Sequence, residues 1–253
     1  MGEYRRPRGL REALSILSDG PWRPIAGGTD IFPARAHAMA WGAPTPENLL
    51  DITGIEELRG VSRGADGNWR IGAATRWAAL RETVLPPGFD ALRTAARQVG
   101  GRQIQARATL GGNLCNASPA ADGVPPLLVL DAEAEIASRE GSRRLKLGDF
   151  ILGNRRTALM AGELLVALHI PAHAAESPSV FLKLGARAHL VISIVMVAAN
   201  AAGRVAVGSC SEVARLWGAE GGLSPIDDVR ATADYRVAAA AELVFRARES
   251  LAA

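Results

Sequence analysis

Hydrophobic residues recur at helical spacing at several places along the chain. Near its start, Leu10, Leu14 and Leu17 fall on one face of a predicted helix, and Asp19-Gly20 ends it. Comparable spacing predicts further helices at 30–39, 75–83, 90–99, 123–131 and 228–251. Thr75 is expected to cap the helix that begins with it.

Short apolar runs, some of them alternating with polar residues, predict the strands of a sheet protein. These runs are 23–26, 48–52, 58–63, 69–74, 134–138, 143–147, 163–170, 179–186, 190–199 and 204–209. Asp66-Gly67, between two of them, is typical of a hairpin turn. Pro171 ends another run, and we interpret 172–178 as a linker.

The order of these elements predicts two units. Helices and strands are mixed without strict alternation, which is typical of an α+β fold. We expect a larger unit at 1–174, divided near residue 55 into two α+β parts. A smaller α+β unit at 178–253 would hold a three-stranded antiparallel sheet and helices.

Two glycine pairs, far apart in the sequence, each follow a short apolar run and lead into a predicted helix. The first is Gly27-Gly28, within 24–31, and the second is Gly111-Gly112, within 109–122. Glycine lets a backbone approach a bulky ligand and can aim successive N–H groups at one point. Because such clusters bind phosphate, the two turns are candidates to grip one phosphate-containing cofactor. Taken singly, each pair is more often an ordinary turn.

Polar side chains are crowded into the second glycine segment. Its glycines are accompanied by Thr109, Asn113, Asn116, Ser118 and Asp122. A segment that only turns needs few such groups, whereas one that binds a sugar chain and a diphosphate uses them all. Each also has a simpler interpretation, because amides and hydroxyls form turns and Asp122 suits a helix N-cap. On the binding hypothesis, Gly111→Val would abolish cofactor retention with little loss of fold.

Composition and charge exclude several classes of function. The 253 residues are 48% hydrophobic, which is enough for a core. With 29 basic and 26 acidic residues the net charge is +3, and no basic stripe typical of nucleic-acid binding occurs. No apolar run approaches the ~18 residues that span a membrane, and the first residues lack the apolar core of a secretory signal. Two cysteines are too few for an iron–sulfur cluster or a typical structural zinc site. We therefore expect a cytoplasmic protein.

Side chains with catalytic potential are isolated in the sequence. Neither glycine segment matches G-x-G-x-x-G, and no G-x-x-x-x-G-K-[ST] occurs, which argues against Rossmann and P-loop sites. His189 has no carboxylate or serine motif near it, so a packed or exposed histidine is the simpler interpretation. Lys183, one of only two lysines, is most simply a lysine on an edge strand. We expect no catalytic side chain and no metal site.

The two glycine segments, in this order and at this separation, resemble those of the flavin-binding subunit of the molybdenum hydroxylases, the family of xanthine dehydrogenase and carbon monoxide dehydrogenase. The stretch 224–236 also resembles that family's tail. The resemblance implies FAD as cofactor and an FAD-binding domain of the vanillyl-alcohol-oxidase (PCMH) type. It implies that the residues in contact with FAD are Pro24, Ile25, Ala26, Gly27, Gly28, Thr29, Asp30, Ile31, Val99, Thr109, Leu110, Gly111, Gly112, Asn113, Asn116, Ser118, Asp122, Leu165 and Lys183.

The same resemblance divides these residues by role. The backbone of 25–29 and of 109–113 would hold the diphosphate, and Asp122 would bind along the ribityl or ribose region. Ile31 would lie against the isoalloxazine ring, which Leu165 and Lys183 would border. Val99 stands where some relatives place an aromatic ring against the flavin.

The resemblance also implies a function within a complex. The chain would be an FAD-dependent oxidoreductase subunit that takes electrons from a small iron–sulfur subunit and passes them to NAD or another acceptor. Substrate would react at the molybdenum cofactor of a large subunit, in a dimer of heterotrimers. Val99 and a shortened segment at 212–223 depart from the family pattern. They leave two alternatives open: an assembly subunit that has lost stable FAD, and a stand-alone flavin oxidoreductase.

Overall fold

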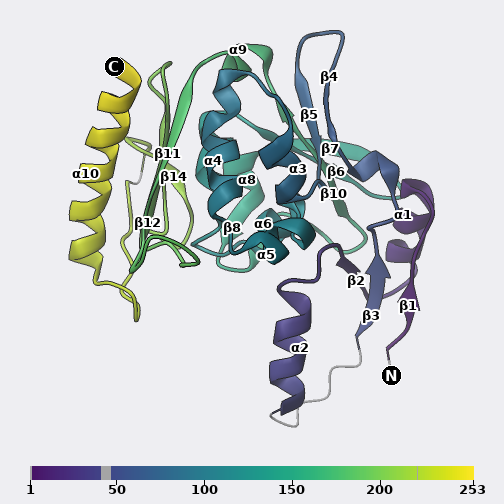
Figure 1. The fold of residues 1–253 in the computed structure, drawn as a ribbon. Coiled ribbons are helices and arrows are strands. Elements are labelled where there is room, and N and C mark those ends of the chain that lie inside the picture. Colours follow the sequence, from purple (N-terminus) through teal and green to yellow (C-terminus); the bar gives the residue numbers. More distant parts are fainter. Residues whose placement is uncertain (1, 41–46, 221) are drawn as a thin grey trace.

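The computed structural model describes residues 2–40, 47–220 and 222–253, in which helices pack between and around β-sheets (Figure 1). The first sheet is parallel, with the strand order β1 (Tyr4–Arg5), β3 (Asn48–Asp51) and β2 (Trp22–Ile25). Helix α1 (Leu10–Ser18) turns its apolar face into the same hydrophobic cluster as this sheet.

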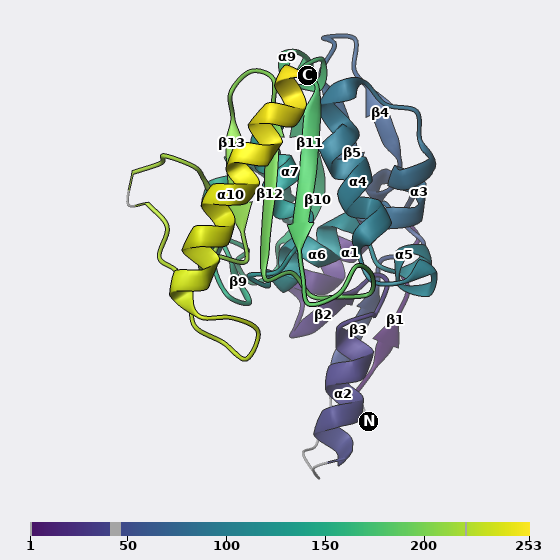
Figure 2. The ribbon, with the colours of Figure 1, turned by 60° about the vertical axis from the view of Figure 1, so that its left-hand side comes forward.

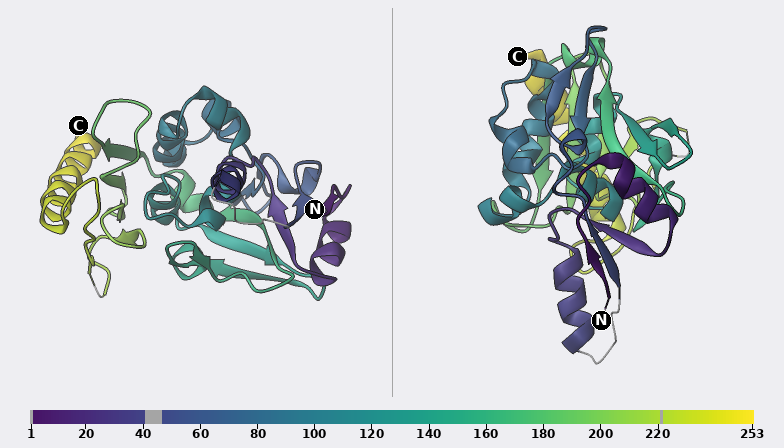
Figure 3. Two further views of the ribbon diagram at one scale, coloured as in Figure 1. Left: turned by 90° about the horizontal axis from the view of Figure 1, so that it is seen from below. Right: turned by 90° about the vertical axis from the view of Figure 1, so that its right-hand side faces the viewer.

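Helix α2 (Ile31–Ala40) projects away from the rest of the molecule (Figures 1 and 3). None of its residues is buried, and the side chains of Phe32 and Met39 are largely exposed. The helix is therefore held to the fold through its N-terminal end, where it follows the first glycine turn.

An antiparallel sheet of five strands forms the centre of the molecule. Its strand order is β4 (Val61–Arg63), β5 (Trp69–Gly72), β10 (Leu164–Ile170), β6 (Glu133–Ala137) and β7 (Ser142–Lys146). The central strand β10 is almost continuously apolar because its two faces serve two cores. Leu165 and Leu168 belong to the main core, whereas Leu164 and Val166 pack in the cluster that includes α1.

Helices cover one face of this sheet and build the main core with it (Figure 3). They are α3 (Trp77–Glu82), η2 (Pro87–Phe89), α4 (Asp90–Gln98), α6 (Leu110–Asn116), α7 (Val124–Val129) and α8 (Leu147–Phe150). Helix α5 (Arg102–Arg107) lies against α3, and η1 (Glu56–Leu58) buries Leu58 in the cluster that includes α1. A small hairpin, β8 (Ile151–Gly153) with β9 (Arg156–Thr157), follows α8.

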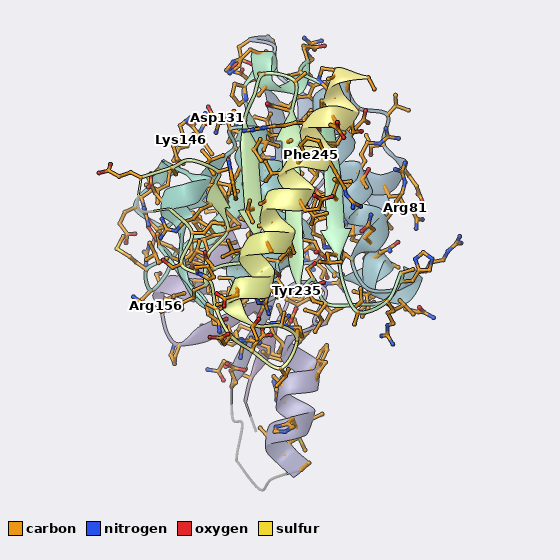
Figure 4. The ribbon with its side chains drawn as sticks, turned by 90° about the vertical axis from the view of Figure 1, so that its left-hand side faces the viewer. Arg81, Asp131, Lys146, Arg156, Tyr235 and Phe245 are labelled. Atoms are coloured by element: carbon orange, nitrogen blue, oxygen red, sulfur yellow. The ribbon has the colours of Figure 1, made fainter. Side chains whose placement is uncertain are left out.

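The C-terminal part is a second antiparallel sheet covered by a long helix. The strands are β11 (Ser179–Leu184), β12 (Val195–Asn200), β13 (Val205–Gly208) and β14 (Arg215–Leu216), in that order. Helix α10 (Ala233–Ala252) lies across one face (Figure 2). Helices α4 and α7 contact this sheet from the main core. Figure 4 shows Tyr235 and Phe245 on α10, and both side chains are more than half exposed.

The α+β expectation is confirmed, and most predicted elements occur within a few residues of their expected bounds. The C-terminal sheet has four strands rather than three, because the two-residue strand β14 carries too little pattern to be recognised. The last helix begins at Ala233, where Thr232 caps it, and not at Asp228. The predicted strand 190–199 is reduced to β12, Val195–Asn200.

Two local predictions are wrong for identifiable reasons, and one helix has no counterpart among the predictions. Thr75 does not cap α3; Arg76 holds that position, and the Thr75 hydroxyl donates to the Gly60 carbonyl. The predicted linker 172–178 contains the short helix α9 (Ala172–Ala175), which buries Ala174 and Ala175. Helix α5 is absent from the predictions because its six residues are mostly polar and too few to show helical spacing.

Candidate cofactor site

The first glycine turn, residues 26–30, connects the end of β2 to α2. Gly28 has a φ of +72°, a backbone conformation that favours glycine. A Cβ atom on Gly27 would lie 2.1 Å from the carbonyl oxygen of Arg107, so that position has no room for a side chain. The turn therefore lies against the residues that precede Thr109, and the two glycine segments are neighbours in space.

The first turn offers backbone donors to a ligand. Within the described ranges, the N–H groups of Gly27, Gly28 and Thr29 donate no hydrogen bond to another part of the chain. Backbone N–H groups are almost always paired with protein, water or ligand. These three are consequently free to bind an anion.

The second glycine segment is a helix and not an open loop. Thr109 caps α6, and its hydroxyl oxygen accepts a hydrogen bond of 3.1 Å from the N–H of Gly112. The neighbouring N–H groups donate to backbone carbonyls: Leu110 to Thr75, Gly111 to Ala73 and Asn113 to Thr109. The expectation of a second cluster of free N–H groups is therefore wrong, because these groups are paired with Thr109 and with the chain at Ala73 and Thr75.

The two glycines of α6 have different surroundings. Gly111 is buried, and a Cβ atom there would lie 2.6 Å from the carbonyl oxygen of Ala73. Gly112 is exposed, and the nearest atom to its Cβ position is the hydroxyl oxygen of Thr109 at 3.0 Å. The expectation that Gly111→Val leaves the fold intact is therefore wrong, since Gly111 is where α6 packs on the chain after β5.

Polar side chains around α6 hold the local structure together. Asn116 donates to the carboxylate of Asp30 at 3.0 Å and accepts from Arg155 at 2.7 Å, so it joins α6 to the first glycine turn. The amide oxygen of Asn113 accepts from the Gly123 N–H, and the Ser118 hydroxyl accepts from that of Ala120. These contacts match the turn-forming interpretation, and contacts of the same residues with FAD stay a prediction.

A cavity of about 270 Å³ lies between the two glycine segments, and we call it the arginine cavity. Its lining residues are Arg6, Ala26, Gly27, Asp51, Thr53, Arg59, Ala74, Arg76, Arg107 and Thr109. Four guanidinium groups from four separate segments favour an anion there. Sequence reasoning missed these arginines, because nothing in their local patterns connects them.

Asp51 is the acidic member of this cavity. Its carboxylate accepts from the Tyr4 hydroxyl at 2.5 Å and lies 3.5 Å from Arg6. Burial raises the pKa of Asp51, but hydrogen bonds from Thr53 and Tyr4 outweigh it and hold the pKa below its ordinary value. Asp51 is therefore ionised, and it ties the N-terminal strand to the end of β3.

A buried ion pair joins the second glycine segment to the C-terminal sheet. Asp122 accepts from the Lys183 ammonium and from the Ser193 hydroxyl, both at 2.8 Å. Burial raises the pKa of the Asp122 carboxyl, and the Lys183 and Ser193 contacts oppose that rise. Asp122 is not the N-cap of α7, a position that Gly123 holds, and Lys183 is not a solvated edge residue although β11 is an edge strand.

A larger cavity, of about 1010 Å³, opens beside Lys183, and we call it the large cavity. Its lining residues are Arg97, Gln98, Gly100, Gly101, Arg102, Gln103, Gln105, Lys183, Leu184, Gly185, Arg187, Ala188, His189, Leu190 and Val191. Its walls therefore come from the end of α4, from α5 and from the loop after β11.

The remaining predicted ring contacts lie at different depths. Val99 caps the C-terminal end of α4, comes between Gln98 and Gly100 of the large cavity wall in the sequence, and is partly buried. Leu165 is buried in the main core on β10 and lines neither cavity.

Among the described residues, no cluster of three or more His, Cys, Asp or Glu side chains is arranged to hold a metal. No helix in the described ranges is long and apolar enough to cross a bilayer.

Comparison with known proteins assigns the chain to a family. The family described as "FAD binding domain in molybdopterin dehydrogenase" matches residues 1–173. The xanthine dehydrogenase FAD-binding subunit of Escherichia coli O157:H7 is 34% identical over 218 residues, which cover 85% of this chain and 73% of that protein.

Two solved structures share the architecture over nearly the whole chain. A chain of CO dehydrogenase from Oligotropha carboxidovorans superimposes with a TM-score of 0.86 at 25% identity, covering 98% of this chain and 96% of that one. For quinoline 2-oxidoreductase from Pseudomonas putida 86 the TM-score is 0.84 at 25% identity, with 99% and 98% covered. The chain belongs to the family of FAD-binding subunits of the molybdopterin dehydrogenases.

Proposed function

We propose that this chain passes electrons from the iron–sulfur clusters of a partner subunit, through FAD, to NAD or another acceptor. The observation that carries the proposal is that three free N–H groups of the first glycine turn lie next to a cavity lined by four arginines. An FAD diphosphate carries two negative charges and many acceptor oxygens. Guanidinium groups and backbone N–H groups are the donors that suit it.

The dimensions of the two cavities also fit FAD. The large cavity is at the upper end of the range for small-molecule sites, which suits a three-ring group. Helix α5 borders both cavities, since Arg102 at its start lines the large one and Arg107 at its end lines the arginine cavity. A single elongated cofactor can therefore have its diphosphate at one end of α5 and its ring at the other.

Each part of the chain would have a definite task. Gly27, Gly28 and Thr29 would hold the diphosphate through their N–H groups, with Arg76 and Arg107 beside it. Lys183 and the loop after β11 would border the ring and exclude water from it. The isoalloxazine itself supplies the electron-transfer chemistry when bound, so the protein needs no acid–base pair of its own.

The proposed assembly follows from the relatives. We propose a complex with a small iron–sulfur subunit and a large subunit that holds the molybdenum cofactor, as a dimer of heterotrimers in the cytoplasm. Within the chain, we propose an FAD-binding domain of the vanillyl-alcohol-oxidase type at 1–174, in two parts meeting near residue 55, and a C-terminal domain at 178–253. The end of the family match at residue 173 supports this division.

One observation favours the alternative of an assembly subunit without stable FAD. The N–H groups at the start of α6 are used within the chain, so of the two glycine segments, both within the described ranges, the first alone offers a cluster of free backbone donors. A flavin spectrum of the purified protein distinguishes the two functions. Stoichiometric FAD supports electron transfer, and a colourless complex of full composition supports assembly.

Replacement of arginines tests the site directly. Arg76→Gln and Arg107→Gln should each weaken FAD binding about tenfold or more, because a charge-assisted hydrogen bond contributes about 1.5–3 kcal/mol. Binding is measured by quenching of flavin fluorescence. Arg156→Gln is the matched control, since Arg156 lies on the exposed strand β9 and lines neither cavity (Figure 4). Equal affinity in all four proteins would contradict the assignment of the arginine cavity.

A further inference from the structure

Lys183 is a buried cation at the wall of the large cavity. Its side chain is 5% exposed and that of its partner Asp122 is 9% exposed. The remaining lysine, Lys146, is half exposed on β7, where it pairs with Asp131 (Figure 4). Charges interact more strongly where water is excluded, so Lys183 acts on its surroundings far more than a surface lysine does.

The hydrogen bonds of Lys183 leave it able to contact a ligand. Its ammonium group donates to Asp122 Oδ2 at 2.8 Å and to the Gln98 carbonyl at 3.4 Å. An ammonium has three N–H donors, so these acceptors leave one. Gln98 is the last residue of α4, whose C-terminal end carries partial negative charge and favours a cation.

Asp122 fixes the position of this cation. One carboxylate oxygen accepts from Lys183 and the other accepts from Ser193, so both oxygens are engaged by the protein. Asp122 precedes α7, Lys183 is on β11 and Ser193 precedes β12. The trio therefore joins three segments and holds the ammonium at the wall of the cavity.

We propose that Lys183, positioned by Asp122 and Ser193, sets the reduction potential of the flavin. This inference rests on the proposed function. Full reduction by the partner's iron–sulfur clusters adds two electrons and one proton to the ring, which then carries one negative charge. A fixed cation beside the ring stabilises that charge and raises the potential, while the Asp122 carboxylate moderates the effect.

The other charged groups at the large cavity have less influence on the reduction potential. Arg97, Arg102, Arg187 and His189 also line the cavity, but all four are exposed to solvent. Water and salt screen exposed charges. The buried pair is therefore the dominant fixed charge on the ring, and its two members have opposite signs.

The test is a comparison of flavin potentials in charge variants. We would load the full chain with FAD, within its complex where the chain alone does not retain it, and measure the midpoint potential by reductive titration against a reference dye. The variants are Lys183→Met, Asp122→Asn and the double variant. Lys146→Met is the matched control.

Opposite shifts are the expected result. Lys183→Met should favour the oxidised flavin at least tenfold, a fall of about 30 mV for a two-electron couple, and Asp122→Asn should shift the potential upward. The double variant should lie between the two, and Lys146→Met should match the unmodified protein. Shifts of the same sign in both single variants, or none, would overturn the inference.

Loss of FAD from a variant or from the unmodified protein has a separate meaning. If Lys183→Met retains no FAD, Lys183→Arg and Ser193→Ala replace it. Lys183→Arg should then leave the ratio of oxidised to reduced flavin at a given potential within twofold of that in the original protein, and Ser193→Ala should change this ratio. A changed ratio in Lys183→Arg with an unchanged one in Ser193→Ala would overturn the inference. Absence of FAD from the unmodified protein would refute the proposed function itself, a result distinct from unchanged potentials in FAD-loaded variants.

Discussion

The two adjacent glycines of α6 provide a sharp test of the structure, because the same substitution should have different effects at each. In Gly111→Ala, the new Cβ would lie 2.6 Å from the Ala73 oxygen and 2.7 Å from the Ala73 Cβ, so backbone must move. In Gly112→Ala, only the Thr109 hydroxyl lies close, at 3.0 Å, and the residue is exposed.

The magnitudes follow from three contributions. Overpacking at Gly111 costs about 1–3 kcal/mol, and loss of its hydrogen bond to Ala73 costs about 1 kcal/mol. Alanine in a helix gains about 1 kcal/mol over glycine. Gly111→Ala should therefore lower the free energy of unfolding by about 1–3 kcal/mol, or the melting temperature by about 2–12 °C. In Gly112→Ala the same gain opposes the close contact with the Thr109 hydroxyl, so the free energy of unfolding should stay within about 1 kcal/mol of that of the original protein.

Urea denaturation without added FAD measures both changes. Gly148→Ala in α8 is the control for the helix effect alone, since the nearest atom to its Cβ position is 4.0 Å away. A Gly111→Ala protein as stable as the Gly112→Ala protein would refute the packing of α6 against Ala73. FAD affinity is then compared between the two proteins to separate binding from folding.

Two further predictions concern the C-terminal part. Arg236 is fully buried and donates to the carbonyls of Ile194 and Ser209, so Arg236→Met should lower the free energy of unfolding by about 3–5 kcal/mol. The control Arg246→Met, at an exposed ion pair, should lower it by less than about 0.5 kcal/mol. Equal losses in the two variants would contradict the burial of Arg236. Burial raises the pKa of Asp228, but bonds from Arg230 and pairing with Arg236 outweigh it and depress the pKa. Its contribution to stability is therefore present above the pKa of the unfolded chain, about 3.9, and is lost as the pH falls below that value. In Asp228→Asn the free energy of unfolding, measured by urea denaturation at a series of pH values, should therefore fall less steeply in acid than in the original protein.

The hydrophobic pattern predicted those elements whose burial is visible in their own residues. Leu10, Leu14 and Leu17 gave α1 its helical spacing, and that helix ends within a residue of the expected position. The run at 163–170, ended by Pro171, predicted a strand, and β10 forms there with both of its faces buried. Such features are local, and local sequence is enough to indicate them.

Other features depend on contacts that local sequence does not contain. Gly111 and Gly112 look alike in sequence, but only the course of the chain after β5 makes one of them a packing position. The four cavity arginines lie in separate segments that folding brings together. Asp122 suits a helix cap by its position, yet the approach of β11 pairs it with Lys183.

Helix α5 shows how one short element can determine the geometry of a whole site. Gln105 is buried, donates to the carbonyls of Arg97 and Val99, and accepts from Arg81 at 2.8 Å. This anchor fixes α5 against the end of α4. Because Gln105 lines the large cavity and Arg107 the arginine cavity, the helix sets the separation of the two cavities. On the function proposed above, a cofactor that spans both cavities would have to match that separation, so α5 as well as the glycine turns would restrict which flavin fits.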